Sequence, residues 1–459
     1  NSEFRTKDIG GKIVFDPTDN LSLNLSGSYH SDNYGLPGDL TEQEVDNDRR
    51  SSNEAQNGAD GRDWYLNMGI DADFGEHGSL IADFSYRDHT SEEEFVSFNY
   101  LSKRESETWA VTPRYVWNGE VLNRANTLIV GVDLYWSEYD VNYYAGIPLS
   151  PNGFSEIEKN TQGFYFNNEI SLLENLFFSL GARHEKAEYD LYQKDLTGFY
   201  SDLDDTETER ENAYSAGLTF QYAGKSSVFI RANRSFRFPL TDELIVFDWM
   251  AVRPGIRVND ISPQRGKHYE IGVKHFFTPD IQANVTLFRA KIKDEIFLNP
   301  SPYENTNHPQ TLHYGVEVGS KAELWHKLTV FGNYTYEKAK FDTDPYDNNN
   351  IPAVPRHKGN LGFRIHDLVP GLIFSTDYNF VSASYAISDQ ANEFKKLDKY
   401  YTINARISYE WRWLKSFVGV NNLTGKEYSE YAVIGGFPEG LNYYPAPERN
   451  WVAGLKIVF

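Results

Sequence analysis

The chain has no cysteine, and it has no long run of apolar residues. The absence of cysteine excludes disulfides and is compatible with an oxidising compartment. No segment approaches the ~18 consecutive apolar residues of a membrane-spanning helix. Phosphate-binding loops, zinc-protease motifs and serine-hydrolase motifs are missing, and the 11 histidines are scattered. The sequence therefore predicts no enzymatic activity, no cofactor and no metal site.

Positive charge is scarce as well. The 44 Lys and Arg residues are outnumbered by 66 Asp and Glu, so the net charge is −22. This excess of negative charge argues against nucleic acid as a partner. The densest acidic runs, residues 201–209 and 342–350, do not have the spacing of a calcium-binding loop.

Aromatic residues, by contrast, are abundant at 15% of the chain, and they favour sheets and lipid–water boundaries. The last ten residues alternate, with five apolar side chains on one face: Trp451, Ala453, Leu455, Ile457 and Phe459. Soluble domains seldom keep such a strand to the last residue, because termini fray. Outer-membrane β-barrels end in this way, with an aromatic residue at the membrane interface.

Alternating strand candidates recur along the whole chain, and the segments between them are alternately short and long. The long polar segments are 38–63, 144–158, 193–210, 239–266, 299–310, 341–356 and 430–447. Short turns on one side and long loops on the other are typical of a transmembrane antiparallel β-barrel. The soluble alternatives are a propeller or a large sandwich, but the repeat of about 40–45 residues that a propeller requires is missing. We therefore predict an all-β fold, with residues 1–459 forming a transmembrane barrel domain.

The number of predicted strands indicates whether this sequence can form a closed barrel. We expect about 19 strands, an odd number, whereas single-chain bacterial barrels have even numbers. The first strand, near residues 6–15, leads into a short turn, so it would run parallel to the last. The expectation is that an odd number of strands precedes this sequence.

Several segments resemble the barrel of TonB-dependent outer-membrane transporters. In chain order they are Ser235–Leu244 (SFRFPLTDEL), Pro263–Gly272 (PQRGKHYEIG), Asn333–Phe341 with Ile351–His357, Val418–Tyr428, Pro445–Trp451 and the terminal Phe459. Gln264 stands where the family usually has Glu. Each segment alone is weak, but their order over 235–459 makes the match specific.

The resemblance implies a barrel of about 22 strands around an N-terminal plug, of which the plug and first strands are absent from this sequence. It implies active uptake of a large scarce solute at the outer membrane of a Gram-negative bacterium, with a ferric siderophore foremost and cobalamin or another chelate as alternatives. The expected partners are outer-membrane lipid and lipopolysaccharide, a plug in cis or as a separate chain, the TonB complex acting through that plug, and a siderophore-like ligand. A plugless porin, or a conduit barrel around a partner protein, is the alternative function.

Two sets of site residues follow. The charged residues expected to face the lumen or the plug are Arg237, Glu243, Glu270, Lys274, Arg406, Glu410 and Lys456. For Arg237 and Glu243 the alternative is that they satisfy each other by hydrogen bonds. The aromatic and cationic residues expected to bind the solute are Tyr143, Tyr144, Trp249, Arg253, Arg257, Tyr443 and Tyr444, because rings and guanidinium groups suit flat or anionic chelates. The alternative for these rings is a place in the interfacial girdle.

Overall fold

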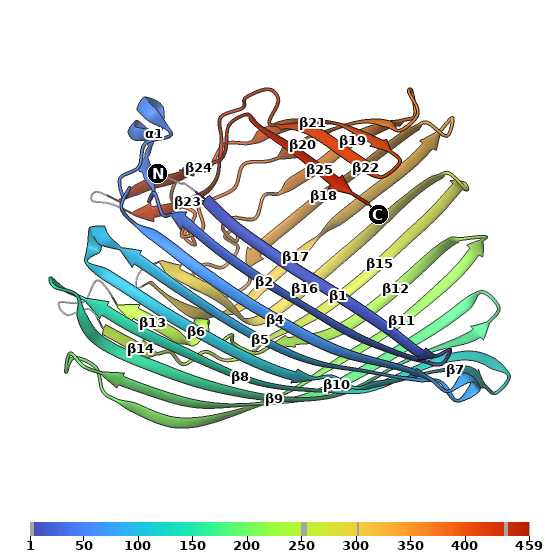
Figure 1. Ribbon diagram of the computed structural model, residues 1–459, viewed down its shortest axis with the longest axis horizontal. Helices are drawn as coiled ribbons and strands as arrows, with labels where there is room; N and C mark the ends of the chain where they lie inside the picture. The colour runs from blue at the N-terminus through green and yellow to red at the C-terminus, as the bar shows by residue number, and fades with distance from the viewer. Residues whose placement is uncertain (1–3, 249–254, 301–302, 436–438, 459) are drawn as a thin grey trace.

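The computed structural model describes residues 4–248, 255–300, 303–435 and 439–458. Its main element is one antiparallel sheet of 20 strands that curls into a barrel wall (Figure 1). With one exception, each strand of the wall pairs with the next wall strand in sequence, as short turns between antiparallel strands require. The prediction of an antiparallel barrel is confirmed.

The wall strands have the following bounds. They are β1 (Phe4–Thr18), β2 (Leu21–Gly35), β4 (Gly58–Asp73), β5 (Ser79–Phe95), β6 (Tyr100–Val111), β7 (Arg114–Val121), β8 (Arg124–Ala145), β9 (Ser150–Leu173), β10 (Leu176–Asp195), β11 (Leu203–Ala223), β12 (Ser226–Arg237), β15 (Gln264–Thr278), β16 (Ile281–Pro300), β17 (Tyr303–Leu324), β18 (Leu328–Phe341), β19 (His357–His366), β20 (Leu372–Val381), β21 (Tyr400–Trp411), β22 (Leu414–Asn421) and β25 (Asn450–Ile457).

Smaller elements lie in the loops. β13 (Ile245–Asp248) pairs with β14 (Gly255–Val258), and β24 (Gly440–Pro445) pairs with both β23 (Ser429–Gly435) and β3 (Leu40–Thr41). The helices are α1 (Glu42–Asp48) and the short 3-10 turns Gly75–His77, Val96–Phe98 and Asp242–Leu244. In the described part of the chain, no helix has the length and apolarity to span a membrane.

One crossing of the wall is broken in the middle. β6 and β7 both pair with β5 on one side and β8 on the other, and Thr112-Pro113 separates them. Proline has no N–H to donate to the ladder, so it interrupts a strand. Because β6 and β7 form one crossing, the 20 strands make 19 crossings, as the sequence indicated.

The two faces of the wall differ in chemistry. On β15, Tyr269, Ile271 and Val273 are 53%, 48% and 39% exposed, whereas Glu270 and Lys274 occupy the opposite face of the same strand. The last strand follows the same rule, with Trp451, Leu455 and Ile457 exposed. We call the apolar, exposed face the outer face and the opposite face the inner face, as expected for a barrel in lipid.

Several strands run far past the membrane. β8 has 22 residues and β9 has 24, whereas a tilted membrane strand needs about 9–11. The predicted loops 144–158, 193–210 and 299–310 are therefore wrong in extent, since most of their residues continue β8 to β11, β16 and β17. The long polar segments are largely paired strands above the membrane.

The two ends of the sheet are open. Among the described residues, β1 pairs only with β2 and β25 only with β22. With an odd number of crossings, β1 and β25 run in the same direction. Loop segments bridge above these two edges, because Arg49 and Arg50 of the first long loop bind residues of the last one.

Candidate functional site

The long-loop end of the barrel is narrowed by a loop that folds inward. Residues 238–263, which join β12 to β15, place the β13–β14 hairpin against β9, β10 and β17. Phe238, Leu244 and Ile261 of this loop form a buried cluster with wall residues that include Ile157 and Tyr189. Ile157 is fully buried, at 0% exposure. Apolar burial of this kind fixes the loop to the inner face.

Polar contacts hold the same loop at its N-terminal end. Lys159 Nζ and Tyr189 Oη both donate to the carbonyl oxygen of Pro239, at 2.8 and 3.0 Å. The Lys159 ammonium also lies 5.0 Å from the centre of the Tyr189 ring. Burial lowers the pKa of Lys159 to about 8, while Glu185 and Glu243 oppose this shift. Lys159 lies above the ~10 residues of β9 that cross the membrane.

The far end of the loop is held by side chains of the wall. Val258 N donates to Gln193 Oε1 at 2.6 Å, and Ser262 N donates to Asn307 Oδ1 at 2.9 Å. Gln193 is 2% exposed, so this hydrogen bond satisfies a buried amide. The hairpin is therefore attached at both ends and along its apolar face.

Arg237 and Glu243 pair with each other. Arg237 Nη1 donates to Glu243 Oε2 at 2.7 Å, and the same oxygen accepts from Leu240 N at 2.9 Å. From the sequence, this mutual hydrogen bonding was the alternative to a role facing the lumen or the plug. The pair orients the start of the inward loop.

The predicted aromatic and cationic cluster is only partly described. Arg257, on β14, forms an ion pair with Glu304. Trp249 and Arg253 lie outside the described residues. Arg257 is thus at the mouth of the barrel with its charge paired to the wall, and its contact with solute stays a prediction.

Tyr143 and Tyr144 lie on opposite faces of β8. Tyr143 is buried at 3% exposure, in a cluster with Tyr139 and Val141, and its ring stacks on Tyr100 with 5.9 Å between centroids. This cluster packs against Ile245 of the inward loop. Tyr144 shares the other face with exposed Trp136, because the two positions differ by an even number of residues.

Tyr443 and Tyr444 belong to a second loop assembly. Tyr443 pairs with Leu40 of β3 and packs against a cluster that includes Leu397 and Ala432. The Tyr444 ring lies 5.3 Å from that of Tyr431. Among the described residues of this predicted set, Tyr143 and Arg257 therefore lie at the β13–β14 hairpin and Tyr443 and Tyr444 at the β23–β24 hairpin, whereas Tyr144 lies on the opposite face of β8 from Tyr143.

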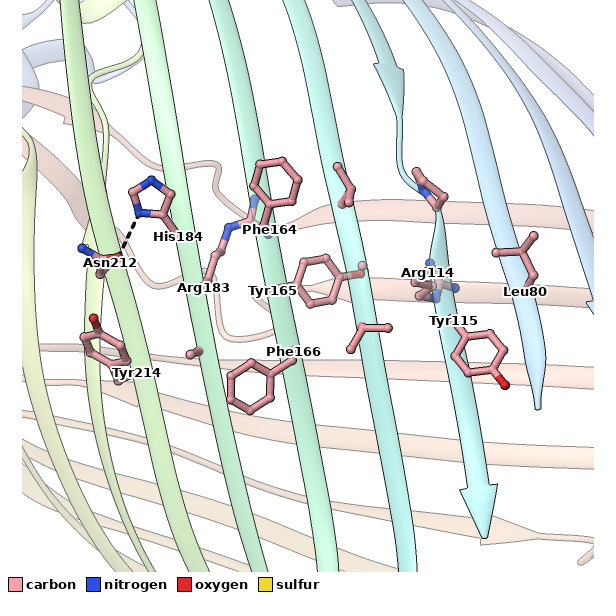
Figure 2. Close-up of a pocket in the computed structure, with 15 residues that line it drawn as sticks. Leu80, Arg114, Tyr115, Phe164, Tyr165, Phe166, Arg183, His184, Asn212 and Tyr214 are labelled. Carbon is pink, nitrogen blue, oxygen red and sulfur yellow. Dashed lines mark hydrogen bonds between the residues drawn. The ribbon is translucent and has the colours of Figure 1, made fainter. Parts of the chain in front are cut away.

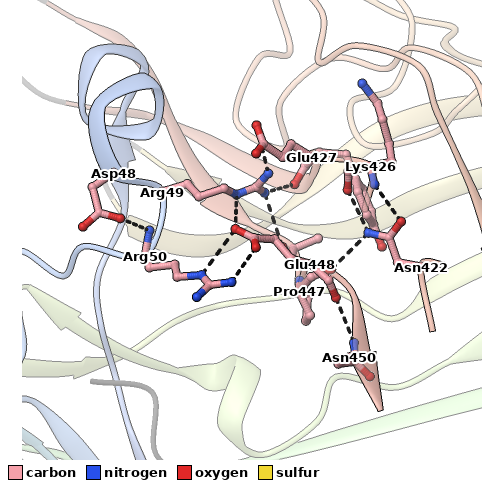
Figure 3. A network of polar contacts seen from close by, with 11 residues as sticks. Asp48, Arg49, Arg50, Asn422, Lys426, Glu427, Pro447, Glu448 and Asn450 are labelled. Carbon is pink, nitrogen blue, oxygen red and sulfur yellow. Dashed lines mark hydrogen bonds and ion pairs between the residues drawn. The ribbon is translucent and has the colours of Figure 1, made fainter. Parts of the chain in front are cut away.

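A polar clasp joins the first long loop to the last one (Figure 3). Arg49, directly after α1, donates from Nη2 to the carbonyl oxygens of Tyr428 and Ala446 at 2.9 and 3.3 Å. Arg50 forms an ion pair of 2.5 Å with Glu448. The helix begins with a capping box between Thr41 and Glu44, which fixes its start. The clasp thus connects loops whose wall strands lie on either side of the open edges.

By strand alternation, the other charged residues predicted to face inward occupy positions opposite the exposed apolar side chains of their strands. Arg406 lies 3.6 Å from the centre of the Phe417 ring, and Lys274 lies 5.1 Å from that of Phe276. Glu410 pairs with Lys415 at 2.8 Å. Glu270 is in register with Arg231, and Lys456 with Lys415. Their contact with a plug or a solute stays a prediction.

The sequence did not reveal the anchoring residues of the inward loop. Lys159, Tyr189 and Gln193 come from strands that precede the loop by many residues, and no motif connects them. It also missed His313, whose Nδ1 lies 3.2 Å from Glu337 Oε1 and whose Nε2 lies 3.7 Å from Glu295 Oε2. Only the pairing of β16, β17 and β18 brings these three residues together.

One hollow of about 620 Å³ lies on the wall itself (Figure 2). Leu80, Val130, Phe164 and Phe166 are among the residues that line it, and Pro113 lies where β6 gives way to β7. His184 and Asn212 are hydrogen-bonded at 3.0 Å at its border. Because Val130, Phe164 and Phe166 are exposed side chains of the outer face, this part of the hollow lies on the side of the wall that faces lipid.

Acidic groups gather on the outer face above the membrane. Carboxylate oxygens of Glu138, Asp140 and Glu156 lie within 4.8 Å of one another. Burial, together with neighbouring carboxylates such as Glu138 and Glu156, raises the pKa of Asp140 to about 6. The three carboxylates of this cluster repel one another, and the cluster by itself does not define a metal site.

A single antiparallel wall with an apolar outer face and a polar inner face defines the protein as a transmembrane β-barrel. The chain belongs to the TonB dependent receptor-like β-barrel family, whose family model matches residues 8–423. Family and fold locate the protein in the outer membrane of a Gram-negative bacterium. The family consists of transporters and receptors, not of enzymes.

The relatives with a known function have low sequence identity to this chain. The chain is 23% identical over 302 residues to the ferrichrome outer membrane transporter/phage receptor of Escherichia coli (strain K12), covering 63% of this chain and 38% of that protein. It is 22% identical over 298 residues to the metal-pseudopaline receptor CntO of Pseudomonas aeruginosa (strain UCBPP-PA14), covering 62% and 39%. The chain thus matches less than half the length of each of these two relatives.

Solved structures share the fold. The ferric citrate transporter FecA in its unliganded form matches with a TM-score of 0.83 at 16% identity, covering 99% of this chain and 70% of that chain. The ferric yersiniabactin uptake receptor FyuA from Yersinia pestis matches with a TM-score of 0.84 at 14% identity, covering 99% and 71%. At these identities the likeness shows the fold alone.

Proposed function

We propose that this chain is the barrel of a TonB-dependent receptor that takes up a metal chelate, with a ferric siderophore as the foremost substrate class. The observation that carries the proposal is the inward loop 238–263, attached to the wall at the mouth of a barrel of this family. A loop docked at the mouth supplies a concave surface with polar and aromatic groups, which a receptor needs to bind its solute. Two of its relatives are a ferrichrome transporter and a metal-pseudopaline receptor, and this supports the substrate class.

The solute would first meet the two loop groups at the mouth. We propose Arg257 with Trp249 and Arg253 as the cationic and aromatic contacts on the inward loop, and Tyr443 with Tyr444 on the second assembly. Guanidinium groups bind anionic oxygens with two parallel hydrogen bonds, and rings stack on flat ligands. Tyr143, which is buried, would support the loop through Ile245.

We further propose that a plug and additional strands complete the protein, either in cis or as a separate chain, and that the TonB complex acts through the plug. The unpaired edges of β1 and β25, which run in the same direction, support the need for an odd number of strands between them. Unpaired strand edges are otherwise exposed to aggregation.

The test is uptake by cells that produce the full-length protein, with a panel of ⁵⁵Fe-labelled siderophores and radiolabelled cobalamin. We expect accumulation of one chelate class that ceases when the TonB complex is inactivated. Large steady conductance in planar bilayers, without energy-dependent uptake, would contradict the proposal and favour a porin or conduit.

Arg257 can be tested with a matched pair of variants. Arg257→Ala removes the guanidinium, whereas Glu304→Gln removes only its carboxylate partner and leaves the guanidinium in place. If Arg257 binds the solute, only the first variant loses about tenfold or more in affinity. Equal effects of both variants would assign Arg257 to loop structure alone.

A further inference from the structure

Two histidines and three aspartates lie close together on the inner face of β1, β2, β4 and β5, which are neighbours in the wall (Figure 1). We call them the His–Asp cluster, and they are Asp8, His30, Asp32, Asp63 and His89. Four of them form one row across the four strands, since each is in register with the next: Asp8, His30, Asp63 and His89. Asp63 directly precedes Trp64, whose exposed side chain marks the outer face, so the row lies on the inner face.

His30 has the two contacts of a metal-binding histidine. Its Nδ1 lies 2.6 Å from Asp8 Oδ1, within hydrogen-bond distance, and its Nε2 lies 3.5 Å from Asp32 Oδ2. The second separation is longer than a good hydrogen bond, but it is close to the ~3.3 Å between two ligands of a tetrahedral zinc ion that each lie about 2.0 Å from the metal. A carboxylate that holds one ring nitrogen commonly directs the other one to a metal.

His89 offers a second ring nitrogen. Its Nδ1 is buried, has no hydrogen-bond partner in the part of the chain that the structure describes, and lies 3.9 Å from Asp63 Oδ2. Asp63 is held in place by Arg87, whose Nε donates to both carboxylate oxygens at 3.1 Å. A buried ring nitrogen without a partner has lost its hydration at a cost in free energy, and a bound cation would compensate for that loss.

A glycine makes room between the two histidines. Gly61 is in register with Asp32 on β2 and with Ser91 on β5, and a Cβ atom on Gly61 would overlap Asp32 Oδ1. The Asp32 carboxylate therefore lies over β4, toward the strand that carries His89. The backbones of His30 and His89 are two strand spacings apart, about 10 Å, and their side chains are 40% and 43% exposed. Both rings therefore have room to turn toward the carboxylate.

The charge of the surroundings favours a cation. Three rows of inner-face positions on these four strands contain the cluster, and they are Thr6, Asp8, Gly10, Ser28, His30, Asp32, Gly61, Asp63, Tyr65, Arg87, His89 and Ser91. With neutral imidazole rings, three negative charges stand against the one positive charge of Arg87. The cluster thus combines ring nitrogens with an excess of negative charge.

We propose that His30, Asp32 and His89 bind one divalent transition-metal ion, and that Asp8 is the positioning residue of His30. Imidazole nitrogens suit zinc, copper, nickel and iron, whereas Mg²⁺ and Ca²⁺ take oxygen ligands. Three protein ligands leave one coordination position open for water. Wall residues alone form the site, so the proposal stands apart from the identity of the solute and from the energy source of its uptake.

The test is a titration of the full-length protein with Zn²⁺ in competition with a chromogenic chelator, after purification without a histidine tag and removal of metal. One variant, His30→Ala with His89→Ala, removes both imidazoles of the cluster. The matched control, His275→Ala with His357→Ala, removes two imidazoles of the outer face, each hydrogen-bonded to a tyrosine at 2.7 Å. Heat-modifiable electrophoretic mobility reports that both variants are folded.

We expect the unmodified protein and the control to bind the same number of Zn²⁺ ions, and the cluster variant to bind one fewer. Asp8→Asn should weaken the binding by about 10- to 100-fold, whereas Asp8→Glu, which keeps a carboxylate, should bind nearly normally. Gly61→Ala should weaken the binding although it removes no donor. Equal binding by the cluster variant and the control would overturn the proposal. Displacement of Zn²⁺ by an equal concentration of Mg²⁺ would also overturn it, because carboxylates alone would then account for the site.

Discussion

Replacing Leu244 by alanine should release the inward loop from the wall. Leu244 is 5% exposed and packs in the cluster that joins the loop to Ile157, Tyr189 and Leu191 of the inner face. Truncation of a buried leucine costs about 2–5 kcal/mol. The lower half of this range applies here, because the loop can settle into the space that the side chain leaves.

The assay is hydrogen exchange followed by mass spectrometry on peptides from residues 238–263. A loss of about 2–3 kcal/mol raises the population of the undocked loop, and hence the exchange rate, by about 30- to 150-fold. The matched control is Leu287→Ala, which makes the same truncation at a position of the outer face that is 53% exposed.

Unchanged exchange of 238–263 in Leu244→Ala would refute the reasoning, since it would mean that the apolar cluster contributes little to docking. Equal acceleration in the control would also refute it, because the effect would then belong to the whole barrel. If exchange behaves as expected, bilayer conductance of the same variant shows whether the docked loop limits passage.

Three further predictions concern charged groups outside the membrane. Burial lowers the pKa of Lys159 from 10.5 to about 8, so between these two pH values Lys159 is protonated more when the loop is undocked. Docking of the loop therefore strengthens as the pH rises from about 8 to 10.5, by about 1–2 kcal/mol after allowance for solvent. The measurement is the hydrogen-exchange rate of residues 238–263 in the unmodified protein divided by that in Lys159→Met, across this pH range. A ratio that does not change with pH would contradict the prediction. Arg49→Ala should accelerate exchange in 422–449 by about tenfold or more, because Arg49 is 9% exposed and donates to two carbonyl oxygens, whereas Arg50→Ala, at 75% exposure, should change it little. Asp140 has its pKa raised to about 6, so its ionisation destabilises the fold as pH rises from about 4 to 6. Asp140→Asn should therefore slow exchange in 138–158 at pH 7, by an energy on the order of 1 kcal/mol after screening, and have no effect below pH 4.

The architecture could be predicted from the sequence because a barrel in lipid imposes a local pattern. Each wall strand has to alternate between lipid and lumen, so Tyr269, Ile271 and Val273 identify their strand without knowledge of its neighbours. The odd number of crossings followed in the same way, by counting strands and turns.

Loop lengths could not be predicted on this basis. Above the membrane neither face of a strand meets lipid, so the apolar alternation ends although the pairing continues. The segment 203–210 is polar at nearly every position and yet continues β11, with its pairs on β10. Only the backbone ladder defines such strands, and the ladder has no signature in side-chain polarity.

The candidate site depends on contacts that are remote in the sequence. Arg237 and Glu243 are six residues apart, and the sequence suggested that they pair. Lys159 and Pro239 are 80 residues apart, and nothing in either segment indicates the other. The anchors of the inward loop could be found only when β9, β10 and β12 were placed in one wall.

The two loop assemblies at the mouth are attached to different parts of the wall, and this constrains how the mouth can open. The inward hairpin depends on β9, β10 and β17, whereas the clasp of Arg49 joins loops on either side of the open edges of β1 and β25. Movement of the hairpin therefore breaks the contacts of Pro239, Val258 and Leu244 but leaves the clasp intact. If a bound solute or a plug displaces only the hairpin, exchange should rise in 238–263 while 422–449 stays protected. A concerted opening of both segments would require a mechanical link between them, whereas the main contacts of the described part of the β13–β14 hairpin are with β9, β10 and β17.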